Sequence, residues 1–370
     1  MIYLDHGATS WPKPEAVARA ADWGLRRLGN PGRGGYPIAM EAAGAIYRCR
    51  QAAGELFSCA PENVVLTTSC THGLNLAIGT LVKPGGRVVV SGFEHNAVTR
   101  PLYGLGAHVV VAGRRLFDRE DTLSAFENVL RTHPDAAVFT HVSNVFGYVL
   151  PVEGIARLCR QYGVPFILDA AQSAGSLEVN MEALGADFIA MPGHKGLQGP
   201  MGTGLLLCSH PPEPLFRGGT GSLSAQQEMP DFLPDRAEAG TANVSGFCGL
   251  AAGIRWVGRV GLQTIARREA RAAALAAEGL RSMGLTVFSG MDQAGTVSFL
   301  PPDGDCETAA ERLAGQGICL RAGLHCAPFA HESAGTLKTG TLRVSFGPQT
   351  NRGQVRGLLE AAKRVFFNGH

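Results

Sequence analysis

Two stretches of this 370-residue chain indicate its fold: Phe166-Ile167-Leu168-Asp169-Ala170-Ala171-Gln172 and Met191-Pro192-Gly193-His194-Lys195. In the first, an apolar run ends in a carboxylate. In the second, the apolar run 188–191 is followed at once by a turn that carries a lysine. The interval between the two runs is long enough for a crossover and a strand, so Asp169 and Lys195 should emerge at one edge of a parallel sheet. Open α/β sheets bind their ligands at that edge, where the strands have their carboxyl ends.

An aspartate that faces a lysine at such an edge suits the cofactor pyridoxal phosphate. This cofactor needs an amine for a Schiff base and an anion that keeps its pyridine nitrogen protonated. A simpler interpretation remains for each residue taken alone, because a strand-end aspartate often caps a helix and an isolated lysine is usually solvated.

Length and composition are those of a globular protein with a large core. A chain of 370 residues exceeds the usual size of one core, which favours one large domain and one smaller domain. The formal net charge is +2 without a basic run, so nucleic acid is not expected as a partner. No apolar segment of 18 residues and no signal-peptide pattern occur, so we expect no membrane association and a cytoplasmic location.

The nine cysteines indicate neither a disulfide framework nor a metal site. Their number is odd and none forms a Cys-x-x-Cys pair. Most are expected to be small core residues, and no metal ligand is predicted.

Strand-like and helix-like patterns alternate over the first 240 residues and predict a mainly parallel sheet with helices on its faces. The expected strands are 63–67, 87–90, 108–111, 137–142, 165–169, 187–191 and 203–208, and residues 154–162 have the spacing of an amphipathic helix.

The pattern after residue 240 predicts a smaller α+β domain with an antiparallel sheet. One or two long helices over 245–283 precede strands at 285–288, 295–300, 318–322 and 341–346, with helices at 306–316 and 354–367. We therefore expect a large domain over 26–244, a small domain over 245–370, and a segment 1–25 that packs on the small domain.

Other polar residues also follow predicted strands of the large domain. The turn 67–73 leads into a helix, and a helix amino terminus with hydroxyl groups binds phosphate, although an ordinary N-cap has the same residues. His95 follows the strand 87–90 and has the shape to lie on a flat ring, and Asn144 follows the strand 137–142. Alone, each is an ordinary loop residue.

In this order along the chain, the motifs resemble the fold-type I pyridoxal phosphate enzymes, and among them the class V aminotransferase family that includes the cysteine desulfurases. The resemblance covers nearly the whole length. It rests on the segments 3–9 (YLDHGAT), 93–96 (FEHN), 143–147 (SNVFG), 169–172 (DAAQ), 193–195 (GHK), 199–204 (GPMGTG) and 238–243 (EAGTAN).

The resemblance implies a role for each polar residue of these motifs. Lys195 would hold the cofactor aldehyde and Asp169 would pair with the pyridine nitrogen, while His95 would lie on the ring. The remaining implied cofactor contacts are Gln172 and Asn144 at the phenolic oxygen, Cys70, Thr71 and His194 at the phosphate, and Thr220 at the phosphate of a partner subunit. The family's active sites lie at a dimer interface, so a homodimer is implied.

The segment 321–327 (RAGLHCA) resembles the corresponding segment of the group II cysteine desulfurases, which serve the SUF pathway of iron–sulfur cluster assembly. Cys326 then aligns with the nucleophile that accepts sulfur from cysteine and passes it to an acceptor protein. The resemblance implies that Arg343 binds the substrate carboxylate, which a planar guanidinium does better than a lysine. Asn144 and Arg321 are further candidates for contact with the substrate, and a loop at Cys326 that moves would carry the thiol to its acceptor.

Two residues depart from the family pattern. Pro192 stands where many desulfurases have a hydroxyl residue, and Leu324 replaces the first histidine of Gly-His-His-Cys. Three alternatives therefore stay open: a selenocysteine lyase, a cystine or cysteine C–S lyase that does not use Cys326, and a cofactor-binding regulator or sulfur-relay protein without turnover.

Overall fold

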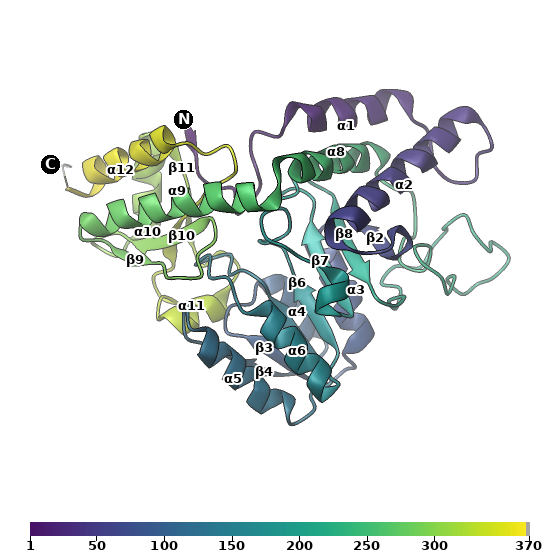
Figure 1. The fold of residues 1–370 in the computed structure, drawn as a ribbon, viewed down its shortest axis with the longest axis horizontal. Coiled ribbons are helices and arrows are strands. Elements are labelled where there is room, and N and C mark those ends of the chain that lie inside the picture. Colours follow the sequence, from purple (N-terminus) through teal and green to yellow (C-terminus); the bar gives the residue numbers. More distant parts are fainter. Residues whose placement is uncertain (368–370) are drawn as a thin grey trace.

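A seven-stranded sheet forms the centre of the larger part of the molecule, and a four-stranded sheet forms the smaller part (Figure 1). The computed structural model describes residues 1–367. In spatial order the large sheet contains β2 (Val64–Thr67), β8 (Gly204–Cys208), β7 (Phe188–Pro192), β6 (Phe166–Asp169), β5 (Ala136–Thr140), β3 (Arg87–Ser91) and β4 (His108–Ala112).

The direction of these strands brings the predicted site residues to one edge. All neighbours from β7 to β4 pair in parallel, whereas β8 is antiparallel to both β7 and β2. Because the two reversals cancel, β2 runs in the same direction as β7. The segments that follow β2, β3, β5, β6 and β7 therefore start from the same edge, and the prediction of a mainly parallel sheet is confirmed.

Both faces of the large sheet are buried, which explains its continuous apolar runs. Successive residues of β6 point to opposite faces: Phe166 and Leu168 belong to one core cluster and Ile167 to the other. The faces are covered by α2 (Pro37–Phe57), α3 (Cys70–Leu81), α4 (Asn96–Gly104), α5 (Arg119–Leu130), α6 (Val152–Tyr162) and α7 (Met181–Leu184), and a 3₁₀ turn at Pro61–Asn63 precedes β2.

The small sheet is antiparallel, as the sequence predicts. Its order is β12 (Arg321–Gly323), β13 (Thr341–Ser345), β10 (Thr296–Leu300) and β9 (Thr286–Phe288). The helices that follow β8 in the chain are α8 (Val244–Val260), α9 (Leu262–Ser282), α10 (Cys306–Gly315), α11 (Pro328–Ala334) and α12 (Arg352–Phe367). The long pattern 245–283 thus forms two helices, which meet at Gly261 with a φ of 84°.

The strand predicted over 318–322 is divided between two sheets. β11 (Ile318–Cys319) pairs in parallel with β1 (Ile2–Tyr3), whereas β12 joins the small sheet. The amino-terminal segment therefore lies against the small sheet, and Asp5 forms an isolated bridge with Ser345. Next along the chain, α1 (Glu15–Arg27) packs on α8. The domain boundaries after residues 25 and 244 remain predictions.

Within residues 1–367, no helix is both long and apolar enough to cross a membrane.

Candidate active site

A cavity of about 450 Å³ lies where the carboxyl edge of the large sheet meets β12, β13 and the loop after β12. Every site residue predicted from the sequence lines it, apart from Thr220. These residues are Cys70, Thr71, His95, Asn144, Asp169, Gln172, His194, Lys195, Arg321, Cys326 and Arg343.

Lys195 and Asp169 lie in this cavity, where burial disfavours the charged form of each side chain. Burial lowers the pKa of the Lys195 amine, against the opposing effect of Cys70 and Asp169. Burial likewise raises the pKa of Asp169, which is 2% exposed, although the Ala171 N–H donates to its Oδ1 at 2.9 Å and Lys195 lies nearby. Lys195 therefore has a larger neutral fraction than a lysine in water, as a nucleophile and proton acceptor requires.

The amino terminus of α3 presents N–H groups to the same cavity. Ser69 caps the helix by accepting from the His72 N–H at 3.1 Å, which leaves the first N–H groups at Cys70 and Thr71 without partners inside the helix. His194 lies nearby with a buried Nδ1 that has no partner, and burial lowers the pKa of its ring to about 4. This corner suits an anion that accepts hydrogen bonds.

His95 is a neutral ring with a fixed tautomer. As the N-cap of α4 it accepts from the Ala97 N–H through Nδ1 at 3.0 Å, so its ring proton lies on Nε2. Burial, and then the cationic Lys195 and Arg343, lower the pKa of His95 to about 4. A flat, uncharged ring on the cavity wall suits contact with an aromatic ligand.

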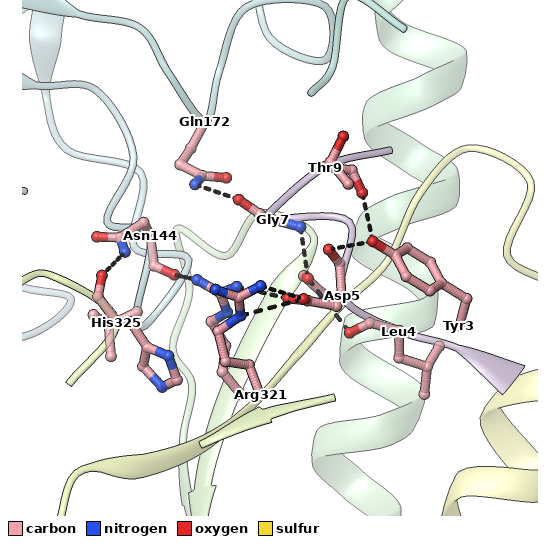
Figure 2. A network of polar contacts seen from close by, with 12 residues as sticks. Tyr3, Leu4, Asp5, Gly7, Thr9, Asn144, Gln172, Arg321 and His325 are labelled. Carbon is pink, nitrogen blue, oxygen red and sulfur yellow. Dashed lines mark hydrogen bonds and ion pairs between the residues drawn. The ribbon is translucent and has the colours of Figure 1, made fainter. Parts of the chain in front are cut away.

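Two amide side chains also border the cavity, and the nitrogen of each donates a hydrogen bond to a backbone carbonyl. Asn144 donates from Nδ2 to the His325 carbonyl at 2.8 Å, and its buried Oδ1 has no partner. Gln172 donates from Nε2 to the Gly7 carbonyl at 3.1 Å. Figure 2 shows both amides near the amino-terminal segment and Arg321, which is described next.

Arg343 and Arg321 converge on one carboxylate, that of Asp5 (Figure 2). Arg343 is 3% exposed and donates from Nη2 to Asp5 Oδ1 at 2.8 Å and from Nη1 to the Asn144 carbonyl at 3.0 Å. Arg321 donates to Asp5 Oδ2 from Nη2 at 2.9 Å and from Nε at 3.2 Å. Buried Nε of Arg343 has no partner, so donor capacity remains for a ligand carboxylate.

The thiol of Cys326 is exposed, while the backbone of its loop is anchored. His325 and Cys326 both have positive φ, 49° and 56°, which non-glycine residues adopt only when neighbouring contacts hold them. The His325 carbonyl accepts from Asn144, and the Cys326 carbonyl accepts from the Asn96 N–H at 2.7 Å. These two bonds anchor the backbone of the loop, and the movement of the loop toward an acceptor stays a prediction.

Thr220 lies apart from the other predicted residues. It lines a separate hollow of about 430 Å³ together with His72, Phe216 and the segment 237–243. The family resemblance implies that Thr220 reaches a partner subunit's site, and its position outside this chain's cavity is compatible with that prediction. Among the described residues, no group of His, Cys, Asp or Glu side chains has the arrangement of a metal site.

Sequence reasoning gave no role to the residues of the amino-terminal segment that touch the site. Thr9, Ser10 and Lys13 all donate to the His194 carbonyl, next to Lys195, with Lys13 Nζ at 2.6 Å. The family motif at 3–9 contains Asp5, Gly7 and Thr9. This motif was the one feature of the sequence that could have pointed to these residues. Their contacts join residues at least 165 positions apart, so spacing could not reveal them.

Comparisons with known proteins agree with this geometry. The family description Aminotransferase class-V matches residues 2–358. A probable cysteine desulfurase of Methanothermobacter thermautotrophicus is 32% identical over 91% of this chain and 89% of its own length, and one of Xylella fastidiosa is 31% identical over 99% and 91%. The apo structure of a cysteine desulfurase from Thermococcus onnurineus superposes with a TM-score of 0.91 at 31% identity, covering 99% of this chain and 95% of that one.

Proposed function

Because the chain belongs to the class V aminotransferase family, we propose that it is a pyridoxal phosphate-dependent cysteine desulfurase. It would convert L-cysteine to L-alanine and hold the sulfur as a persulfide on Cys326. The observation that carries the proposal is one cavity that contains a buried amine, a buried arginine and an exposed thiol: Lys195, Arg343 and Cys326.

The residues present fit the cofactor. Lys195 supplies the amine and the buried Asp169 supplies the carboxylate for the pyridine nitrogen. The amino terminus of α3 and His194 form the anion-binding corner, and Asn144, which lines the cavity, has a buried Oδ1 without a partner. Pro192 contributes no hydroxyl and no N–H to this corner, so Thr71 and the N–H groups of α3 would hold most of the phosphate.

When bound, pyridoxal phosphate supplies an electron sink that stabilises negative charge at the carbons of the substrate. Asp169 would keep that sink effective by a carboxylate contact with its ring nitrogen. Lys195 would take the proton from the substrate Cα, because burial lowers the pKa of this amine and enlarges its neutral fraction.

Arg343 would bind the substrate carboxylate through the donors that Asp5 and Asn144 leave free. This contact would fix one end of the amino acid and leave its side chain within the same cavity as the exposed Cys326. Orientation of this kind converts a collision between two thiols into a step within one complex.

The sulfur-transfer step forms one bond and breaks one bond. The Cys326 thiolate attacks the substrate sulfur, the S–S bond forms, and the Cβ–S bond breaks with its electron pair retained by the carbon fragment. Lys195 would return the proton to Cα, and a second proton, which the thiols have released, would add to Cβ to complete L-alanine. The net change is L-cysteine plus the Cys326 thiol to L-alanine plus a Cys326 persulfide, without an external oxidant.

An acceptor for the persulfide sulfur and a second copy of the chain complete the proposal. The exposure of Cys326 supports transfer to a separate acceptor protein, and the position of Thr220 supports a homodimer. A place in iron–sulfur cluster assembly and a cytoplasmic location remain predictions from the sequence.

Product analysis of the purified protein with L-cysteine tests the proposal. A desulfurase releases about one equivalent of L-alanine per site without reductant, and with dithiothreitol it releases alanine and sulfide in equal amounts. Pyruvate with free sulfide in the absence of reductant would instead identify a C–S lyase. A parallel assay with L-selenocysteine addresses the lyase alternative, because turnover of selenocysteine without turnover of cysteine would reject the desulfurase.

A further inference from the structure

The carboxylate of Asp5 is the common partner of both arginines that border the substrate end of the cavity. One oxygen accepts from Arg343 at 2.8 Å and the other from Arg321 at 2.9 Å. Both arginines line the cavity, whereas Asp5 is not among the residues that line it. Asp5 therefore lies behind the two guanidinium groups and does not occupy the space of a ligand.

The backbone on both sides of Asp5 is fixed to the small sheet. Asp5 forms a parallel bridge with Ser345, two residues beyond Arg343, and the Ser345 N–H donates to the Leu4 carbonyl at 2.8 Å. On the other side, the Gly7 N–H donates to Ser345 Oγ at 2.7 Å. Tyr3 adds a bond from its hydroxyl to the Asp5 carbonyl at 3.1 Å. These contacts hold the carboxylate at the arginines in the orientation seen in Figure 2.

Asp5 also sets the charge of this end of the cavity. Two guanidinium groups carry a charge of +2, and the carboxylate reduces the sum to +1. One substrate carboxylate neutralises that remainder, whereas a ligand with a second carboxylate leaves an uncompensated negative charge beside the buried Arg343. Arg343 is 3% exposed, so water compensates such a mismatch poorly.

We propose that Asp5 is a positioning residue that holds Arg343 and Arg321 for a single carboxylate and thereby selects monocarboxylic amino acids. The proposal rests on the proposed function, in which Arg343 binds the substrate carboxylate. It adds a residue that does not touch the substrate and a reason for discrimination against acidic amino acids.

The test compares Asp5→Asn with the wild type and with Asp22→Asn. The control removes a carboxylate that pairs with Arg26 on the exposed surface of α1, so both variants make the same change of charge in the amino-terminal segment. The measurements are kcat and KM for L-cysteine and the inhibition constants of L-alanine, which has one carboxylate, and L-aspartate, which has two. Bound cofactor is measured by its absorbance.

We expect Asp5→Asn to raise KM for L-cysteine about tenfold and to change kcat less than about threefold. The variant loses the orientation of the Arg343 and Arg321 guanidinium groups, whereas the residues that carry out the reaction are unchanged. The net charge facing the ligand rises to +2, so inhibition by L-aspartate should strengthen at least about fivefold relative to inhibition by L-alanine. Asp5→Glu should restore much of the wild-type ratio, and Asp22→Asn should match the wild type.

Wild-type values of both KM and the inhibition ratio in Asp5→Asn would overturn the proposal. If that variant does not fold, Arg321→Gln tests the same charge argument, because it changes the net charge at this end of the cavity in the opposite direction. Its side chain is 53% exposed, and its loss lowers the net charge to zero, so L-aspartate should inhibit more weakly relative to L-alanine. An unchanged ratio in Arg321→Gln would reject the charge argument.

Arg343→Ala separates this proposal from the proposed function. An unchanged KM in Arg343→Ala would show that the substrate carboxylate binds elsewhere, and the proposed function of the site would fail. A large rise of KM in Arg343→Ala together with wild-type behaviour of Asp5→Asn would reject only the role of Asp5.

Discussion

At the scale of single residues, the site contains ionisable groups whose pKa is shifted by burial toward the neutral form. Lys195 is surrounded by β6, β7 and the start of α3, and its pKa is lowered by burial despite the nearby Asp169. His95 and His194 both have a pKa lowered to about 4 by burial, so their rings are neutral at physiological pH. Permanent positive charge in the cavity therefore comes from Arg343 and Arg321.

The first prediction concerns Lys195 and the cofactor. Reduction of the holoenzyme with borohydride should fix pyridoxal phosphate to Lys195, and peptide mass spectrometry should find the modified lysine there. Lys195→Ala should lose the trapped cofactor completely, because Lys195 is the one lysine among the described residues that lines the cavity. The control Lys338→Ala removes an exposed lysine and should be labelled like the wild type. A labelled Lys195→Ala protein would show that another residue holds the cofactor.

Site residues that directly follow an apolar strand could be predicted from the sequence. Contacts between residues far apart in the chain, such as those between the amino-terminal segment and the small sheet, could not. Asp169 and Lys195 were found because each ends a local pattern whose direction is fixed by the sheet. Asp5 occurs in a quoted motif, but its partners Arg321 and Arg343 lie 316 and 338 positions away. Only the pairing of the amino-terminal segment with the small sheet brings them together.

At the scale of elements, Glu94 links the carboxyl ends of two strands beneath the site. Its Oε1 accepts from the N–H and hydroxyl of Ser91 at the end of β3 and from the Thr140 N–H at the end of β5 at 2.9 Å. Its Oε2 is buried without a partner. Burial raises the pKa of Glu94 to about 8, in spite of these three hydrogen bonds. The carboxyl is therefore protonated in the folded protein at neutral pH.

The second prediction is a pH-dependent effect of Glu94→Gln on stability. In the unfolded chain the carboxyl ionises near its ordinary pKa of 4.5, whereas in the folded protein it keeps its proton up to about 8. The stability that Glu94 contributes below pH 4.5 is therefore lost as the pH rises from 4.5 to 8. The amide introduced by Glu94→Gln accepts the same bonds without this loss. The melting temperature of Glu94→Gln minus that of the wild type should rise by about 2–4 °C between pH 5 and pH 8.

The control for this prediction is Glu278→Gln, which changes an exposed glutamate of α9. Its melting temperature should follow the wild type at each pH. A difference between Glu94→Gln and the wild type that stays constant from pH 5 to pH 8 would show that Glu94 is ionised in the folded protein.

Element types followed from local patterns, whereas their partners did not. The 3.6-residue spacing of 154–162 corresponds to α6, and the alternation of the carboxy-terminal part corresponds to the antiparallel sheet. The single pattern 318–322 gave no sign of its division, because Ile318–Cys319 and Arg321–Gly323 have similar strand propensity. The pairing of the first with β1 decides the division, and a two-residue strand has too little pattern to be recognised.

At the scale of the whole molecule, the segment 209–243 between β8 and α8 has no helix or strand and projects from the large sheet (Figure 1). It carries large exposed side chains, including Phe216, Leu223 and Phe232. Long irregular segments with exposed apolar groups are commonly part of an interface. Thr220 lies in this segment, which supports the proposed homodimer in which it reaches the other copy.

The third prediction is that the protein sediments as a dimer and that Leu223→Asp shifts it toward the monomer. Leu223 is 43% exposed with a φ of 48°, a conformation that aspartate tolerates better than leucine, so the fold of one copy should persist. A charge placed in an apolar interface should raise the dissociation constant of the dimer by at least about tenfold. Met291→Asp, at a 96% exposed position between β9 and β10, is the control and should remain dimeric.

Analytical ultracentrifugation at micromolar concentrations checks this prediction. A monomeric wild type would reject the homodimer, and a Leu223→Asp protein as dimeric as the wild type would place the interface elsewhere.

The persulfide on Cys326 is the central claim, and intact-protein mass spectrometry after incubation with L-cysteine tests it most directly. The wild type should gain one sulfur, about 32 mass units, which dithiothreitol removes and which peptide mapping locates at Cys326. Cys326→Ala should gain none. Cys59→Ala, which removes a half-buried thiol whose pKa is raised to about 11 by burial, should gain sulfur like the wild type. Formation of alanine without a sulfur adduct, or an adduct that persists in Cys326→Ala, would contradict the account.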